Sequence, residues 1–175
     1  MSKLSTEELR EQKPSREEFV QREKNKVVLI LDGIQSSHNI GAMIRLSDAF
    51  CLDKLVICGD LKINPKKLRK TSIGTQKWVK VEEEASTVNV VNMLKEQGYQ
   101  IAAIELCKTS INYLTAEYQL PIAFVLGSEK KGVCDEVIAL ADMQIHIPMF
   151  GMGNSMNVSS AGAIVVADCI AKLTQ

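Results

Sequence analysis

The chain has 175 residues, of which 46% are hydrophobic and 24% are charged. This length and composition suit one globular domain with a proper core. The formal net charge is zero, which disfavours a strongly basic protein that binds nucleic acid over its whole surface but leaves room for a local basic patch. The five cysteines form no CxxC pair, and neither a secretory leader nor an apolar run of membrane length is present. We therefore expect a cytoplasmic protein without disulfides, zinc or membrane contact.

Residues 1–25 are rich in charge and lack a regular apolar pattern. Ser5 with Glu8, and Ser15 with Glu18, have the spacing of a capping box, in which a serine caps a helix and a glutamate reaches back to it. We predict one or two short helices that dock on the domain or on a partner, although a frayed tail suits the composition equally well. We treat this extension as separate from a domain that spans residues 26–175.

From Val27 onward, short apolar runs alternate with segments of helical periodicity. The apolar runs predict buried strands at residues 27–31, 54–58, 78–81, 100–104, 122–126 and 144–147. The segments between them predict helices at about residues 39–50, 85–97 and 135–141, and a final helix that ends near residue 172. Strands separated by helices indicate an α/β fold with a mostly parallel sheet and helices on both faces. Ligands bind such sheets beyond the carboxyl ends of the strands.

One concentrated group of basic residues follows the second predicted strand, on a loop and short helix around Pro65. Its members are Lys62, Lys66, Lys67, Arg69 and Lys70. A solvated surface and a contact with a polyanion explain this group equally well.

Two predicted strand ends carry polar residues with a choice of roles. After the first strand, Asn39 and Gly41 open a helix, and Arg45 lies about one and a half turns along it among apolar neighbours. Such an arginine either pairs internally or points into a cleft, and it needs an anion or an acidic partner. Glu129 comes just past another buried strand. Asn39 and Glu129 are alternatively simple helix caps.

A third stretch, residues 147–162, is rich in glycine and small polar residues. Gly151 and Gly153 permit a positive φ angle and a close approach to a ligand, while Ser155 and Asn157 have side chains that bond a ligand or cap a helix. Ser159 fits a capping role. Taken alone, the stretch is better explained by an ordinary turn between a strand and a helix.

Together, the order and spacing of the three stretches resemble the SpoU/TrmH class of the SPOUT methyltransferases, which transfer a methyl group from S-adenosylmethionine to RNA. The resemblance covers about residues 27–173. Its first motif appears as Asn39-Ile-Gly-Ala-Met-Ile-Arg45, its second as Phe124-Val-Leu-Gly-Ser-Glu-Lys-Lys-Gly-Val133, and its third as residues 147–159. The chain departs from the pattern at Leu46-Ser47, where a threonine is common, and at Met156, where leucine is usual. Both departures preserve size or apolar character.

The resemblance implies a C-terminal trefoil knot and a homodimer whose catalytic centre lies at the subunit interface. It further implies a bent S-adenosylmethionine, gripped by backbone groups of the second and third motif loops. Independently of the resemblance, we expect no metal, because the sequence offers too few ligands near its two histidines, His38 and His146. The implied cofactor contacts are Glu105, Leu126, Gly127, Ile147, Met149 and Met156. The implied catalytic residue is Arg45, and the residues that orient it and the ribose are Asn39, Glu129, Ser155 and Asn157.

The reaction implied by the resemblance is attack of a ribose 2′-hydroxyl on the cofactor's methyl group. We favour tRNA over ribosomal RNA as the substrate, because we expect no appended RNA-binding domain and a compact RNA suits the basic segment, the N-terminal helix and the dimer surface. The alternatives are the same reaction on ribosomal RNA and a non-catalytic RNA-binding assembly factor of the same fold. A Rossmann-like enzyme acting on a small nucleotide is disfavoured, because no G-x-G-x-x-G follows the first strand.

Overall fold

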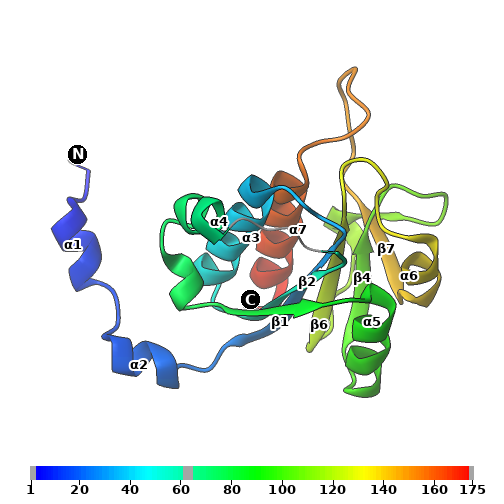
Figure 1. Cartoon of the computed structure of the whole chain (residues 1–175). Helices are drawn as coiled ribbons and strands as arrows, with labels where there is room; N and C mark the ends of the chain where they lie inside the picture. Colours follow the sequence, from blue (N-terminus) through cyan, green and yellow to red (C-terminus); the bar gives the residue numbers. More distant parts are fainter. Residues whose placement is uncertain (1–2, 61–64, 174–175) are drawn as a thin grey trace.

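The computed structural model describes residues 3–60 and 65–173, which form a seven-stranded sheet of wholly parallel pairs (Figure 1). The strand order is β3-β2-β1-β6-β4-β7-β5. The strands are β1 (Asn25–Asp32), β2 (Leu52–Cys58), β3 (Lys80–Glu84), β4 (Gln100–Ile104), β5 (Ile111–Asn112), β6 (Ile122–Gly127) and β7 (Met143–His146). The predicted parallel α/β sheet is therefore confirmed.

Helices cover both faces of this sheet, as predicted (Figure 1). Alternate residues of β1 enter two separate cores, because successive side chains of a strand point to opposite faces. Leu29 and Leu31 pack with α3 (Ser37–Ala49) and α7 (Val158–Leu173), whereas Val28 and Ile30 pack with α5 (Thr87–Glu96). The helices are α3 (Ser37–Ala49), α4 (Pro65–Thr71), α5 (Thr87–Glu96), α6 (Asp135–Leu140) and α7 (Val158–Leu173), with short 3₁₀ turns η1 (Thr75–Lys77) and η2 (Tyr113–Thr115).

The edges of the sheet differ from the prediction. The strand predicted at residues 78–81 begins at Lys80 and ends at Glu84, because Trp78 still belongs to the cap of η1, which ends at Lys77. This strand pairs with β2 alone and holds Glu82 through Lys54 and Lys80, each at 2.7 Å. It therefore lacks the apolar run that marks a central strand. The two-residue strand β5 was not predicted, because it is too short to show a period.

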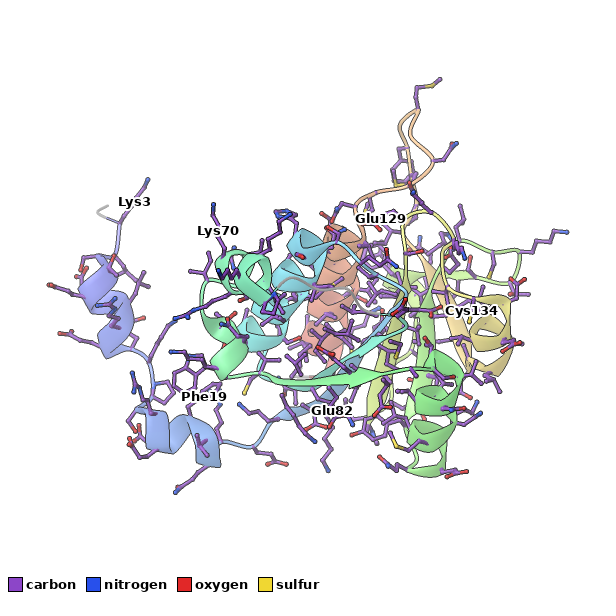
Figure 2. All side chains as sticks on the ribbon, in the orientation of Figure 1. Lys3, Phe19, Lys70, Glu82, Glu129 and Cys134 are labelled. Atoms are coloured by element: carbon purple, nitrogen blue, oxygen red, sulfur yellow. The ribbon has the colours of Figure 1, made fainter. Side chains whose placement is uncertain are left out.

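The N-terminal extension contains two short helices, α1 (Thr6–Glu11) and α2 (Arg16–Gln21), and both predicted capping boxes are present. No described residue of α1 is buried, and this helix stands apart from the domain (Figure 1). In contrast, α2 docks through Phe19, whose ring packs edge-to-face with that of Trp78 at a centroid distance of 5.9 Å and an angle of 79° (Figure 2). The extension thus contacts the domain through α2.

The predicted basic group falls mainly on α4, which carries Lys66, Lys67, Arg69 and Lys70. Lys62 lies outside the described residues. Helix α4 packs against α3, and Gly41 makes this contact possible, because a Cβ atom there would lie 2.2 Å from Thr71 Oγ1 and 2.9 Å from its carbonyl carbon. Thr71 Oγ1 also donates to the Ser37 carbonyl oxygen at 2.8 Å. None of the helices in the described ranges is both long enough and apolar enough to span a membrane.

Candidate active site

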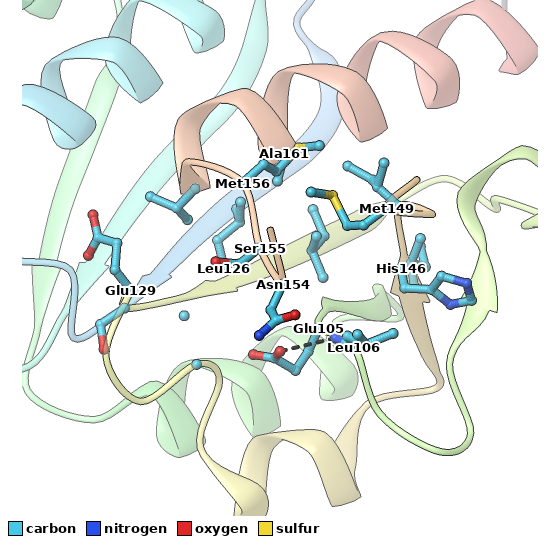
Figure 3. Close-up of a pocket in the computed structure, with 17 residues that line it drawn as sticks. Glu105, Leu106, Leu126, Glu129, His146, Met149, Asn154, Ser155, Met156 and Ala161 are labelled. Carbon is cyan, nitrogen blue, oxygen red and sulfur yellow. Dashed lines mark hydrogen bonds between the residues drawn. The ribbon is translucent and has the colours of Figure 1, made fainter. Parts of the chain in front are cut away.

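A cavity of about 260 Å³ opens at the carboxyl ends of β4, β6 and β7 (Figure 3). Its walls come from four segments of the chain: the end of β4, the loop after β6, the end of β7 and the approach to α7. The lining residues are Ile104, Glu105, Leu106, Leu126, Gly127, Ser128, Glu129, Gly132, Ile145, His146, Ile147, Met149, Asn154, Ser155, Met156, Val158 and Ala161.

All six residues predicted to contact a cofactor line this cavity, together with two of the predicted catalytic residues. The cofactor set is Glu105, Leu126, Gly127, Ile147, Met149 and Met156, and the catalytic pair is Glu129 and Ser155. Their side chains come from segments that are far apart in sequence, and the parallel sheet brings them to one edge. Whether each contacts a cofactor stays a prediction.

The buried side chain of Asn39 connects the three motif stretches. Its amide group donates to Glu129 Oε1, and its Oδ1 accepts a hydrogen bond of 3.0 Å from Asn157 Nδ2. Only 4% of Asn39 is exposed. The alternative reading of Asn39 as a helix cap is wrong, because Ser36 caps α3 and its hydroxyl accepts from the Asn39 backbone N–H at 3.4 Å. Asn39 is thus free to reach across to the other two loops.

The capping roles considered for Glu129 and Ser159 are also wrong. Helix α6 begins after Cys134 and has no side-chain cap. At the start of α7 the acceptor is Asn157, whose Oδ1 bonds the Ser159 backbone N–H at 2.9 Å. Asn157 therefore caps α7 and holds Asn39 at the same time, which fixes the start of α7 relative to α3.

Glu105 ties the end of β4 to the second motif loop. One carboxylate oxygen accepts from the Leu106 N–H at 3.0 Å and the other from the Val133 N–H at 2.9 Å. Gly132, at a φ of 67°, leaves room for this carboxylate, since a Cβ there would lie 2.3 Å from Glu105 Oε2. Gly127 is equally confined, because a Cβ atom added to it would lie 1.9 Å from the Gly132 carbonyl carbon. These two glycines close the loop against the cavity.

The glycines of the third motif behave differently from the prediction. Neither Gly151 nor Gly153 has a positive φ angle, and a Cβ at Gly151 would meet nothing within 4 Å. The loop that contains them stands out from the domain (Figure 1), with Phe150 98% exposed and Met152 fully exposed. No neighbouring atoms confine this backbone, and the close approach of these glycines to a ligand stays a prediction.

Arg45 lies on the exposed side of α3 and does not line the cavity. It follows Asn39 by six residues, which corresponds to about 240° around a helix of 3.6 residues per turn. The two side chains therefore leave α3 in different directions. Within residues 3–60 and 65–173, Arg45 has no ion-pair partner and no side-chain hydrogen bond to Asn39, Glu129, Ser155 or Asn157.

A second cavity of about 700 Å³ adjoins the first and shares Ser128, Glu129 and Gly132 with it. Its opposite wall includes Asp32, at the end of β1. Asp32 accepts hydrogen bonds from Thr87 Oγ1 at 2.6 Å and from the Cys134 N–H at 2.9 Å. Glu129 thus stands in the wall between two adjacent spaces.

His146 is a lining residue that the sequence reasoning did not assign to the site. Its Nδ1 lies 3.0 Å from Ser110 Oγ, and this hydroxyl donates its proton to the Cys107 carbonyl oxygen at 2.7 Å. Nδ1 is therefore the donor to Ser110. The position of His146 directly before the third motif was the available signal. In the part of the chain that the structure describes, no three His, Cys, Asp or Glu side chains gather as a metal site would require.

A sequence model described as the SpoU rRNA Methylase family matches residues 26–167. The tRNA (guanosine(18)-2'-O)-methyltransferase of Aquifex aeolicus is 34% identical over 85% of this chain and 71% of its own length. The enzyme of the same name from Thermus thermophilus is 32% identical over 86% of this chain and 77% of its own.

Solved structures agree with this likeness. The A. aeolicus TrmH/SpoU tRNA modifying enzyme superposes with a TM-score of 0.77 and 32% identity, covering 86% of this chain and 77% of that one. An AdoMet-bound rRNA methyltransferase from Sinorhizobium meliloti reaches a TM-score of 0.78 at 21% identity, over 86% of this chain and 58% of that one. Because its identity is only 21%, the match to the S. meliloti structure supports the fold alone.

Proposed function

Because the chain belongs to the SpoU methylase family, as its three motifs predict, we propose that it transfers a methyl group from S-adenosylmethionine to a ribose 2′-hydroxyl in tRNA. The observation that carries the proposal is the hydrogen-bonded set Asn39, Glu129 and Asn157, one residue from each motif, at the edge of a cavity lined by residues of the second and third motifs. The relatives from Aquifex and Thermus, named as tRNA 2′-O-methyltransferases, support tRNA as the substrate.

The lining of the first cavity suits S-adenosylmethionine. Leu126, Ile147 and Met156 provide apolar surface for a flat base, and the carboxylates of Glu105 and Glu129 give the cavity negative charge for a cationic ligand. When bound, the cofactor supplies a methyl group already activated by a positively charged sulfur. The protein must therefore position the ribose hydroxyl in line with that methyl group and manage the hydroxyl proton.

Arg45 is the residue we assign to the developing alkoxide. A guanidinium stays protonated and is a poor base, so its role is to stabilise negative charge on the ribose oxygen and to hold a backbone phosphate. Its exposure, without an ion-pair partner in the described part of the chain, leaves it available to RNA. Glu129, Ser155 and Asn157 are assigned to orienting the ribose.

We infer that Arg45 acts in the cavity of a second copy of the chain. Arg45 leaves α3 in a different direction from its own Asn39, which bonds Glu129 in the wall of its own cavity. A symmetric dimer that buries the face of α3 carrying Arg45 would bring each Arg45 to the partner's site. The apolar side chains of Phe150 and Met152, exposed beside the cavity, support such an interface.

The acceptor ribose would approach through the second cavity, since Glu129 borders both spaces. We also propose that the chain from residue 147 to 157 completes a trefoil knot. In support, β7 pairs with β4 and β5, whereas α7 packs against α3 and β6, so the chain between them crosses back over the strand ends.

Mapping of 2′-O-methylated nucleosides by mass spectrometry, in tRNA and ribosomal RNA from a deletion strain and its parent, tests the reaction and the substrate. We expect one tRNA position to lose its methyl group. Loss confined to ribosomal RNA would favour the second candidate substrate, for which the Staphylococcus haemolyticus relative named "Putative TrmH family tRNA/rRNA methyltransferase" is a precedent. No loss in either RNA, with no heat of S-adenosylmethionine binding by titration calorimetry, would indicate a non-catalytic assembly factor.

Arg45→Ala should abolish methyl transfer while S-adenosylmethionine binding survives, with Arg10→Ala on the distant helix α1 as the control arginine. Mixing Arg45→Ala with Glu129→Ala tests the shared site. If Arg45 serves the partner's cavity, each mixed dimer has one intact site, and about a quarter of all sites regain activity. If both residues serve the same chain's cavity, mixing restores nothing.

A further inference from the structure

A groove between the N-terminal extension and the domain lies apart from the active site, and we propose that it binds one nucleotide of single-stranded RNA. The groove has a volume of about 420 Å³. Helix α2 and the residues before it form one wall, and the end of α3 with η1 and Trp78 forms the other. The residues that carry the argument are Lys13, Arg16, Phe19, Arg22, Asp48 and Trp78.

The charge of this groove suits a phosphate. Lys13, Arg16 and Arg22 line it, against the single carboxylate of Asp48. Among residues 3–60 and 65–173, none of these three cations has an ion-pair partner. Three cations directed at one space, with one acid to offset them, leave an excess of positive charge that a phosphate group would neutralise.

The groove also offers a flat aromatic surface. Trp78 is partly exposed, and Phe19 supports its ring in an edge-to-face contact. The Arg16 guanidinium lies 5.9 Å from the centre of the indole. Nucleobases stack on aromatic rings and on guanidinium planes, so a base can lie against Trp78 while its phosphate meets Arg16 and Arg22.

The basic surface continues beyond the groove. The sequence contains no acidic residue between Asp60 and Glu82. Within this stretch, Arg69 and Lys70 on α4 and Lys77 on η1 are exposed, and Figure 2 shows Lys70 directed away from the domain. A strand of RNA that leaves the groove would therefore meet further cations along α4.

These features favour RNA over an acidic peptide. A peptide of aspartates or glutamates would use the cations, but it has no flat ring to stack on the indole and would place its carboxylates near Asp48. A nucleotide uses the indole as well, and its N–H or hydroxyl groups can donate to the Asp48 carboxylate. The inference rests on the proposed function only in taking RNA as the natural ligand.

Trp78 is the only tryptophan of the chain, so its fluorescence reports directly on this groove. The full-length protein is titrated with a single-stranded adenosine RNA hexamer, and with an abasic hexamer of the same backbone. We expect saturable quenching by the adenosine hexamer and much weaker quenching by the abasic one. Equal quenching by both, no quenching by either, or equally strong quenching by an acidic peptide would overturn the proposal.

The variant Arg16→Ala/Arg22→Ala should bind the hexamer at least about tenfold more weakly, and the slope of log affinity against log salt should shrink by about 1.4. Both residues are exposed, so circular dichroism should show an unchanged fold. The matched control, Lys95→Ala/Lys108→Ala, removes the same charge outside the groove and should change affinity less than twofold. An equal loss in both variants would show that the effect is only overall charge.

This readout does not depend on methyl transfer. Methylation of tRNA without Trp78 quenching would refute the groove and leave the proposed function standing. Quenching that follows the predicted pattern in a protein that methylates no RNA would support the groove and refute the proposed function.

Discussion

Replacing Asn39 with alanine tests whether one buried side chain ties the three motif loops together. The amide of Asn39 donates to the Glu129 carboxylate, and its oxygen accepts from Asn157. A hydrogen bond to a charged group contributes about 1.5–3 kcal/mol to stability, and a neutral one about 0.5–1.5 kcal/mol. Glu129 and Asn157 are exposed and can turn to water after the substitution, so the lower ends apply. We expect the free energy of unfolding to fall by about 2 kcal/mol.

Asn89→Ala is the matched control. Ser86 caps α5 as Ser36 caps α3, and each serine hydroxyl accepts from the backbone N–H of the asparagine three residues later, at 3.3 and 3.4 Å. The Asn89 side chain is exposed, and it makes no hydrogen bond within the described residues. Since both substitutions change the same helix position, the difference between them isolates the bonds of Asn39 to the other loops.

The assay is urea unfolding followed by circular dichroism, with a thermal scan beside it. For a chain of this length, about 2 kcal/mol corresponds to a midpoint lowered by about 4–8 °C. Asn39→Ala should also weaken S-adenosylmethionine binding in titration calorimetry, because Glu129 lines the cavity and Asn157 lies at the start of α7. If Asn39→Ala and Asn89→Ala agree within about 0.5 kcal/mol, the network adds no stability and the reasoning fails.

Two further substitutions test the packing of α4 and the edge of the sheet. Gly41→Ala places a Cβ against Thr71. Alanine gains about 1 kcal/mol in helix propensity, but the overpacking should still lower the free energy of unfolding by about 1–2 kcal/mol in urea. An unchanged midpoint would show that α4 moves away freely. Hydrogen bonds from Lys54, the larger cause, and from Lys80 hold the pKa of Glu82 below its usual value. That stability is present above about pH 4.5 and is lost as pH falls through the lowered pKa, so Glu82→Gln should unfold more easily than the parent at pH 7 and lose less on acidification to pH 3.

The central strands were predictable because both faces of the sheet are covered. Residues 27–31 form an unbroken apolar run, and the structure sends alternate members of it into two cores. The same reasoning misplaced the edge strand β3, whose one unpaired side and exposed glutamates do not need apolar residues. Trp78 looked like a strand residue by composition, yet its ring belongs to the contact with Phe19.

The residues of the candidate site were predictable as a set, but their roles were not. The sequence places Ser36 and Ser37 before Asn39, and no local rule says which of the three caps the helix. The role of Asn39 is decided only by its hydrogen bonds to Glu129 and Asn157, which are 90 and 118 residues away in sequence. Gly132 shows the same limit, since the Glu105 carboxylate that needs its missing side chain comes from another strand.

The spacing of the first motif follows from two faces of α3 with different contacts. Asn39 bonds Glu129 in the wall of its own cavity, and Gly41 admits Thr71 of α4. Arg45 follows Gly41 by four residues and so lies on the same face of the helix, one turn further on. The face that receives the basic helix α4 is therefore also the face that presents Arg45. A phosphate backbone held by α4 would therefore run toward Arg45 without crossing the helix. This arrangement would join RNA binding to the residue assigned to catalysis. It depends on Gly41, which lets α4 approach the face that carries Arg45.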